Sequence, residues 1–339
     1  MQAKLWKKLQ TRDYEKEIAK SNLELSAILG LLDYESYFKF THTKQPEKID
    51  EIAYYLLQEE ILLKQDNGLY AITNLGAVLF AKRISDFSSV ERKAIRLVQY
   101  ENNNRLKLLR EMNITKGYVA GFEDLMEYLD VLIPSEEIIN GAVREKKTAY
   151  PLIALRELIA NALIHQDFSI SGTGPTIEIF ADRIDITNPG VLLVDLHRIV
   201  DSPPKSRNEK LAGLMRRMKL CEELGTGWDK VVSSCELNML PAPKINFYED
   251  SVRVTLYSHI DFAKIAMEER IWACYLHACI LFVQGNSLTN SSLRKRFGVK
   301  LSASGSISRV IKLAVERNLI KVKDSKTAPR YMSYIPIWA

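Results

Sequence analysis

The chain has 339 residues, 47% of them hydrophobic and 26% charged, which is typical of a globular protein large enough for two or three domains. No apolar run approaches the ~18 residues of a membrane-spanning helix, and no apolar leader follows the basic first residues. The four cysteines show neither disulfide-framework nor zinc spacing. We therefore expect a cytoplasmic protein with no membrane partner.

The charge is unevenly distributed along the chain. From Lys264 to Ala339, thirteen Lys and Arg residues stand against four acidic residues, a net charge of +9. The whole chain carries +5, so the preceding residues carry −4. This asymmetry predicts a polyanion as partner of the C-terminal end, with a merely solvated basic surface as the alternative.

The N-terminal third predicts a small helical unit. Residues 1–43 are polar with a helical pattern, and an amphipathic helix follows over 47–63. Asp66, Asn67 and Gly68 then predict a hairpin, and a further helix covers 74–82. Helix, hairpin and helix in this order resemble a winged-helix unit, although a purely structural module fits as well.

The middle of the chain alternates strand and helix patterns. We expect strands within 92–100, 176–186 and 245–257, and helices over 121–134, 152–168 and 209–218. In "TIEIFADRIDI" four isoleucines alternate toward one face: Ile177, Ile179, Ile184 and Ile186. Ser206 and Glu209 have the spacing of a capping box at the start of a helix.

The basic tail predicts a winged helix-turn-helix. A long helix from Glu268 to Val283 precedes a short helix ending at Gly298, a recognition helix from about Ser304 to Asn318, and a basic hairpin. On the recognition helix, the core positions are expected to be Ile307, Val310, Ile311 and Leu313. The expected DNA contacts, base-reading positions included, are Arg294, Lys295, Ser306, Arg309, Lys312, Lys321, Lys323 and Lys326.

Three short segments predict a nucleotide pocket. Glu157, Asn161 and His165 recur every four residues, and so share one face of a helix. Asn161 offers an oxygen of the kind that Mg²⁺ prefers, and Glu157 could orient or deprotonate an attacking water. Asn188, beside Pro189 and Gly190, could bind an adenine edge.

The third segment, Gly225 to Gly227, would let backbone N–H groups approach phosphates at a helix N-terminus. Each segment is weak evidence alone, since a helical Glu–Asn pair, a lone glycine turn or a single His is more often structural. Their order along the chain is what favours a nucleotide site.

That order resembles a known family. "RELIANALIHQDFSISGTGPTIEIFADRIDITNPG" and "SPPKSRNEKLAGLMRRMKLCEELGTGWDKV" are similar to the divergent GHKL-type ATP-binding domain of bacterial proteins described as transcriptional regulators. The same domain is also described as similar to the C-terminal part of an ATP-dependent DNA helicase. Such proteins commonly carry an upstream Schlafen/AlbA-like domain, and this chain begins after that point.

The resemblance implies ATP and Mg²⁺ as cofactors and assigns roles by position. Glu157 matches the catalytic acid of the superfamily's N box, and Asn161 its magnesium ligand. The implied nucleotide contacts are Asn161, His165, Asp185, Asn188, Gly190, Arg207, Gly225, Thr226 and Gly227. The aspartate usual in the first glycine box is replaced by Asn188, unless Asp185 takes its place.

We therefore expect an α+β fold, with a GHKL-like sandwich at 89–262 between an N-terminal module at 1–88 and a winged helix at 263–339. The leading hypothesis is an ATP- and DNA-binding regulator whose lid, Asp201 to Met218, reorients the winged helix. An ATPase acting on nucleic acid, with hydrolysis through Glu157, is the first alternative. An interaction protein that has lost nucleotide binding is the second, and homo-oligomerisation stays open.

Overall fold

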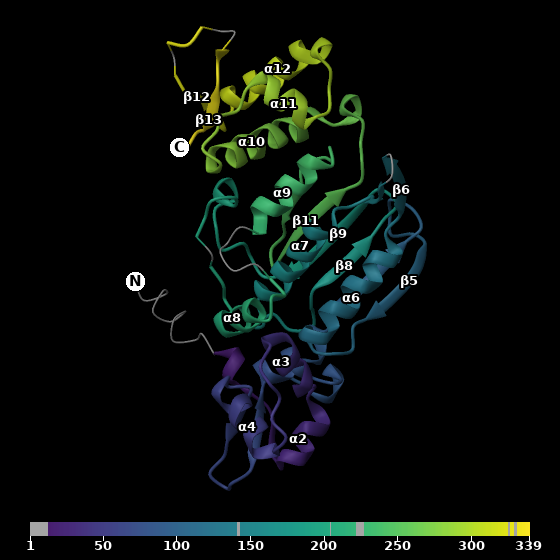
Figure 1. The fold of residues 1–339 in the computed structure, drawn as a ribbon, viewed down its shortest axis with the longest axis vertical. Coiled ribbons are helices and arrows are strands. Elements are labelled where there is room, and N and C mark those ends of the chain that lie inside the picture. Colours follow the sequence, from purple (N-terminus) through teal and green to yellow (C-terminus); the bar gives the residue numbers. More distant parts are fainter. Residues whose placement is uncertain (1–12, 141–142, 204, 222–226, 325, 329–330) are drawn as a thin grey trace.

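The computed structural model describes residues 13–140, 143–203, 205–221, 227–324, 326–328 and 331–339. The fold is mixed α+β, with an N-terminal part, a central sheet and a C-terminal part arranged along its longest axis (Figure 1). This confirms the predicted fold class, whereas the domain boundaries at 88 and 262 stay a prediction. Among the described residues, no helix is long and apolar enough to cross a membrane.

The N-terminal part is a three-stranded antiparallel sheet, in the order β1-β3-β2, with short helices around it. After a 3₁₀ turn at Tyr14–Lys16 its elements are β1 (Ile18–Leu23), α2 (Leu25–Leu31), α3 (Tyr34–Thr41), α4 (Ile49–Gln58), β2 (Leu62–Lys64), β3 (Tyr70–Thr73) and α5 (Asn74–Phe80). The predicted turn lies between β2 and β3, where Gly68 has a φ of +79°. The helical prediction for residues 1–43 is wrong at β1, because pairing with β3 overrides the local pattern.

The central sheet has six strands in the order β10-β11-β9-β8-β4-β5, and its one parallel pair is β4 with β8. Its strands are β4 (Arg96–Tyr100), β5 (Leu108–Asn113), β8 (Thr176–Ile179), β9 (Arg183–Pro189), β10 (Lys244–Phe247) and β11 (Ser251–Tyr257). The four alternating isoleucines of β8 and β9 are all buried, and they pair as Ile177 with Ile186 and Ile179 with Ile184. The predicted inward face is therefore confirmed.

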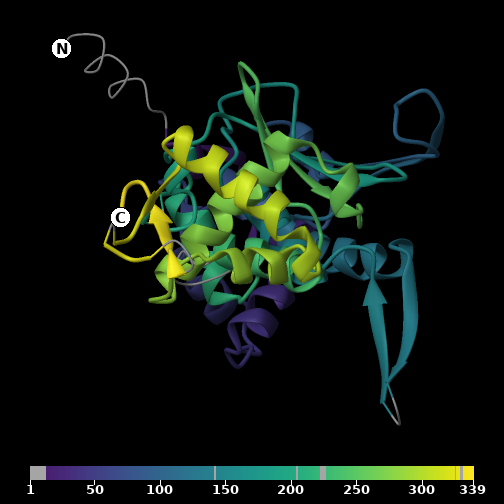
Figure 2. The same ribbon diagram turned by 90° about the horizontal axis from the view of Figure 1, so that it is seen from above.

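The helices of the central region contribute buried residues to the same hydrophobic core as this isoleucine face. They are α6 (Tyr118–Leu132), α7 (Leu152–Ile164), α8 (Glu209–Arg217) and α9 (Gly227–Leu237). Of these, α7 packs on β9 and lies between α6 and α9. Between α6 and α7 the chain forms a hairpin that was not predicted, β6 (Ser135–Asn140) and β7 (Val143–Thr148), and it projects from the body (Figure 2).

The C-terminal part consists of α10 (Met267–Val283), α11 (Asn290–Arg296), α12 (Ser304–Glu316), β12 (Ile320–Val322) and β13 (Tyr334–Pro336). These elements follow the predicted order of three helices and a hairpin. The N-terminal part and the central sheet share one hydrophobic core. The C-terminal part has a second core, which also takes in Ile199, Val200, Val232 and Ala242 from the central region.

Candidate functional site

A cavity of about 860 Å³ lies among α7, α8, the first turn of α9, strands β9 to β11 and the segment 191–206. A volume of several hundred cubic ångströms suits a small organic ligand such as a nucleotide. Its walls combine an apolar floor with a few polar and basic groups. Those groups come from segments that are far apart in the sequence.

The α7 wall carries the three residues predicted to share a face. Glu157, Asn161 and His165 all line the cavity. Glu157 is buried, with 5% of its surface exposed, whereas Asn161 and His165 are partly exposed. The apolar side of α7, including Leu155 and Ile159, enters the main core. A carboxylate and a carboxamide are therefore presented to the cavity by a helix whose remaining residues, apart from Arg156, are apolar.

Gly227 begins α9 directly against this wall. A Cβ atom at Gly227 would lie 2.7 Å from Oε2 of Glu157 and 3.6 Å from Nδ2 of Asn161. Only a glycine fits at this distance without displacing the carboxylate. The predicted partners Gly225 and Thr226 lie outside the described residues. Of the second glycine segment, the structure thus places Gly227 at the cavity.

The floor of the cavity is the paired ends of β9 and β11. Ile186 pairs with Val254 and Asn188 pairs with Val252, and all four side chains line the cavity. Side chains two apart on a strand share a face, so Asn188 stands at the edge of an apolar patch. Such a patch suits a planar aromatic base, with the Asn188 amide available for its polar edge.

Asp185 is on the other face of the sheet and does not line the cavity, so its predicted contact with nucleotide stays a prediction that this geometry does not favour. It alternates with Ile184 and Ile186, and its Oδ1 accepts a hydrogen bond from Thr255 Oγ1 at 2.7 Å. Its Oδ2 lies 3.4 Å from Nε of Arg183. Asp185 therefore belongs to a buried polar network behind the cavity floor.

Gly190 ends the floor and shapes it without lining it. Its φ is +110°, and an added Cβ would lie 3.0 Å from Cβ and 3.1 Å from the backbone nitrogen of Asp167. An L-residue is strained at this φ whatever space surrounds it. The backbone, rather than a ligand contact, thus accounts for this glycine.

Arg207 lines the cavity, but its guanidinium is already engaged. Nη1 donates to the carbonyl of His165 at 3.1 Å and Nη2 to that of Val191 at 2.8 Å. Its Nε is 3.8 Å from Oδ2 of Asp167. These contacts tie segment 191–207 to the end of α7, which favours a positioning role over the predicted direct contact.

His165 gives the cavity a pH-dependent group. Burial, followed by the positive charge of Arg207, lowers its pKa from 6.5 to about 4. His165 is therefore neutral in the folded protein at pH 7. As pH falls from 6.5 toward 4 the unfolded chain takes up a proton that the folded protein resists, so stability falls.

We expect His165→Gln to remove part of this acid sensitivity, on the order of 1–3 kcal/mol between pH 7 and pH 4.5. Urea unfolding at the two pH values measures the change. His259→Gln, at an exposed histidine, is the matched control and should keep the parent's pH dependence. If the free energy of unfolding falls by the same amount between the two pH values in the parent and in His165→Gln, His165 is not the source of the acid sensitivity.

Two cations that sequence reasoning missed also reach the cavity, Lys205 and Arg216. On α8, Glu209, Ala212 and Arg216 are spaced by three and four residues and face the cavity together. Arg216 donates from Nε to its own helix at Ala212, 3.2 Å away. Neither cation has a carboxylate partner among the described residues. The helical spacing could have revealed Arg216, because Arg217 falls outside that face.

Segment 191–218 is held at both of its ends, but not as predicted. The N–H groups of Lys210 and Leu211 donate to the buried Glu15 of the N-terminal part, at 3.4 and 2.7 Å, so Glu15 caps α8 in place of the predicted Ser206 capping box. Ion pairs of Lys210 with Glu60 and of Arg217 with Glu59 add to this contact. Thus α8, within the predicted lid, is attached to the N-terminal part.

The earlier half of this segment contacts the C-terminal part instead. The Tyr275 hydroxyl donates to the carbonyl of His197, and Trp338 Nε1 donates to that hydroxyl at 2.9 Å. The Arg198 guanidinium lies 4.3 Å from the ring centroid of Trp338. Ile199 lines the cavity and also belongs to the C-terminal core. The cavity wall and the C-terminal part therefore share side chains.

The donor set at α7 fits a magnesium ion that arrives with a nucleotide. No group of three or more His, Cys, Asp or Glu in the described part of the chain is arranged to hold a metal. Mg²⁺ needs no such cage, because it commonly binds through one or two protein oxygens, waters and substrate phosphates. Asn161 would supply the protein oxygen, and the ion would neutralise phosphate charge beside Glu157.

The predicted nucleic-acid residues lie on the outside of the C-terminal part. Ser306, Arg309 and Lys312 are exposed on α12, while Ile307, Val310 and Ile311 are buried. Leu313 is only half-buried, and Ala314 takes the expected core position.

The other predicted phosphate contacts differ in whether their side chains already have hydrogen-bond partners in the protein. Lys295 and Lys326 are exposed, and Arg294 donates to Asn290 Oδ1 at 3.0 Å. Lys321 Nζ donates to the carbonyl of Ala339 at 2.5 Å, and Lys323 Nζ donates to Ser287 Oγ at 3.1 Å. Lys321 and Lys323 would have to release these partners to bind phosphate.

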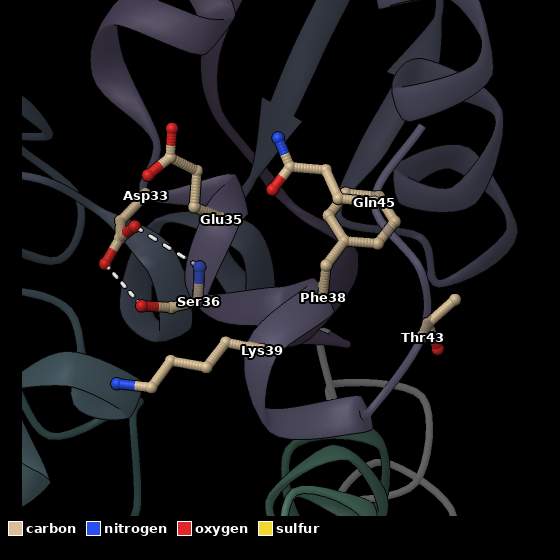
Figure 3. A pocket seen from close by; sticks show the side chains of 7 residues that line it. All are labelled: Asp33, Glu35, Ser36, Phe38, Lys39, Thr43 and Gln45. Carbon is tan, nitrogen blue, oxygen red and sulfur yellow. Dashed lines mark hydrogen bonds between the residues drawn. The ribbon is translucent and has the colours of Figure 1, made fainter. Parts of the chain in front are cut away.

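A second hollow, of about 500 Å³, lies against α3 in the N-terminal part (Figure 3). The hydrogen bonds drawn there run from Ser36 to Asp33, which caps the N-terminus of α3. These hydrogen bonds stabilise the first turn of α3. The hollow has neither the converging segments nor the apolar floor of the larger cavity.

Comparisons with known proteins agree with the fold of the central region. Residues 172–256, less than half of the chain, match the family model described as "Putative ATP-dependent DNA helicase recG C-terminal". This match supports an ATPase-type domain around the cavity. No curated protein matches the chain.

One solved structure shows a similar fold over almost the whole chain. It is the crystal structure of the DIP2311 protein from Corynebacterium diphtheriae, with 18% sequence identity and a TM-score of 0.59. The match covers 98% of this chain and 66% of that one, so the chain spans about two thirds of that protein's length. At this identity the likeness concerns the fold alone.

Proposed function

We propose that the protein is an ATP- and DNA-binding regulator, in which Mg·ATP in the cavity controls a winged helix formed by residues 263–339. The observation that carries the proposal is the meeting of Glu157, Asn161, Asn188 and Gly227 at one cavity of nucleotide size. The adenine would lie on the floor of β9 and β11, and the phosphates near Asn161 and the first turn of α9. The match of residues 172–256 to an ATPase-type family supports this reading.

Calorimetric titration of the whole chain with ATP, with and without Mg²⁺, tests the proposal. We expect saturable binding of one ATP per chain, weakened when Mg²⁺ is removed. Absence of ATP binding in both conditions would favour the alternative of an interaction protein that has lost nucleotide binding. An ATPase acting on nucleic acid is the second candidate, favoured by the buried Glu157 beside Asn161, and it requires measurable phosphate release.

Arg216 provides a test of where the phosphates lie. Arg216→Gln should weaken ATP binding by about 10- to 100-fold, because a hydrogen bond to a charged group is worth about 1.5–3 kcal/mol, and should leave adenosine binding unchanged. Arg217→Gln is the matched control, since Arg217 pairs with Glu59 and does not line the cavity. Equal effects of both substitutions on the ratio of ATP to adenosine affinity would exclude Arg216 from the phosphate site.

A further inference from the structure

Helix α9 connects the cavity to the C-terminal part in a single rigid element. Its first residue, Gly227, lies against Glu157 and Asn161, and the next, Trp228, lines the cavity. Along its length α9 packs on α7 and on α10, with Val232 in the C-terminal core. Figure 1 shows α9 between α7 and α10. A displacement of its first turn is therefore carried to its far end.

The far end of α9 meets the C-terminal part through a buried polar cluster. Glu236 of α9 has an Oε2 atom 2.8 Å from Nδ1 of His277 on α10. Its Oε1 atom is 3.9 Å from Nε of Arg296 on α11. His277 and Arg296 are 7% and 4% exposed, so this junction lies out of water.

The junction is incompletely satisfied. Within the described part of the chain, Oε1 of Glu236, Nε of Arg296 and Nε2 of His277 have no hydrogen-bond partner. A buried charge cluster with unmet hydrogen bonds stabilises a protein little, since desolvation offsets much of the attraction. An alternative arrangement that pairs the same three groups again could therefore compete with this one, whereas separating them without new partners would be costly. This is the property expected of an element with two discrete positions.

The cluster is next to the residues predicted to bind DNA. Arg296 ends α11, directly after Arg294 and Lys295, and its Nη1 also donates to the carbonyl of Leu240, just beyond α9, at 3.0 Å. The turn that follows is equally close, because a Cβ at Gly298 would lie 2.6 Å from Sδ of Met239. The end of α11 is therefore in direct contact with the residues that follow α9.

We propose that α9, through the junction of Glu236, His277 and Arg296, transmits occupancy of the cavity to α11 and so sets the DNA affinity of the C-terminal part. This inference rests on the proposed function. A phosphate or Mg²⁺ entering beside Asn161 would act on the first turn of α9, where Glu157 and Gly227 already leave no space and where the helix N-terminus attracts anions. Glu236 and Arg296 are positioning residues in this scheme.

The test compares the parent with the double variant Glu236→Leu/Arg296→Met, because removing both residues together leaves neither the buried carboxylate without its guanidinium nor the guanidinium without its carboxylate. Affinity for a random-sequence DNA duplex is measured with and without Mg·ATP, and ATP affinity with and without DNA. In the parent each ligand should change the other's affinity by the same factor, about 5- to 150-fold. In the double variant this factor should fall below twofold, with the affinities for ATP alone and DNA alone retained.

Hydrogen exchange at the amides of α11, with and without Mg·ATP, provides a readout that needs no DNA. ATP should change exchange there in the parent and not in the double variant. Ile307→Val, a mild change in the C-terminal core, controls for destabilisation and should keep the coupling. The inference fails, while the proposed function stands, if the parent binds ATP and DNA without either changing the other's affinity. It fails in the same way if the double variant shows the same coupling between the two affinities as the parent. A parent that binds no ATP overturns the proposed function, and the inference with it.

Discussion

Replacing Asn161 with Ala is expected to weaken Mg·ATP binding at least about tenfold and to remove its dependence on the metal, whereas Glu157→Gln should leave binding intact and stop hydrolysis. Asn161 is the partly exposed donor at the cavity, and its loss removes an oxygen that a hard cation prefers. Glu157 is buried behind it. Its carboxylate can orient or deprotonate a water, an effect worth about 10²- to 10⁴-fold in rate.

Calorimetry with Mg·ATP and phosphate release, on the parent and both variants, separate these roles. Glu157→Gln keeps the shape of the buried side chain, so a loss of ATP binding in that variant would contradict the division of labour. If the pair is only structural, both substitutions lower the melting temperature and neither has a specific nucleotide effect. Thermal unfolding of each variant without nucleotide is therefore the necessary control.

The parts of the site that follow from local periodicity could be predicted from the sequence. Glu157, Asn161 and His165 needed only the helical repeat to be placed on one wall. The choice between Asp185 and Asn188, which the sequence analysis left open, could have been narrowed by the same kind of argument. Asp185 and Asn188 are three residues apart on one strand, and an odd separation puts them on opposite faces. Only one of them can reach the cavity.

The parts that depend on distant segments could not be predicted. The N-terminus of α8 is capped by Glu15, whose carboxylate accepts a hydrogen bond from the N–H of Leu211, 196 residues later in the chain. The predicted lid therefore joins the N-terminal part at α8, and it is the preceding segment, from Leu192 to Val200, that packs against the C-terminal core. Strand β1 exists because β3 is available to pair with it. No local pattern at these positions contains that information.

Loss of two exposed cations from α12 should sharply weaken DNA binding by the whole chain. In the variant Arg309→Glu/Lys312→Glu, the plot of log K against log salt, which falls with salt, should become shallower. Each lost phosphate contact should reduce the magnitude of its slope by about 0.9. Both side chains are exposed on the face opposite to Ile307 and Val310. Lys312 has only an exposed partner, Glu316, at 3.7 Å, and such a pair competes weakly with phosphate.

The matched control is Lys44→Glu/Lys64→Glu, which makes the same change in net charge at two exposed positions of the N-terminal part. Mobility shifts with a random-sequence duplex, over a series of salt concentrations, give both slopes. If binding reflects overall charge, the two variants lose affinity equally, because long-range attraction depends on the summed field. If α12 contacts the DNA backbone, only Arg309→Glu/Lys312→Glu should show a weaker salt dependence of DNA affinity. The reason is that the salt dependence reflects the number of phosphates that the protein neutralises. A parent that is not retarded even at low salt would remove DNA from the proposed function and leave the nucleotide site to stand alone.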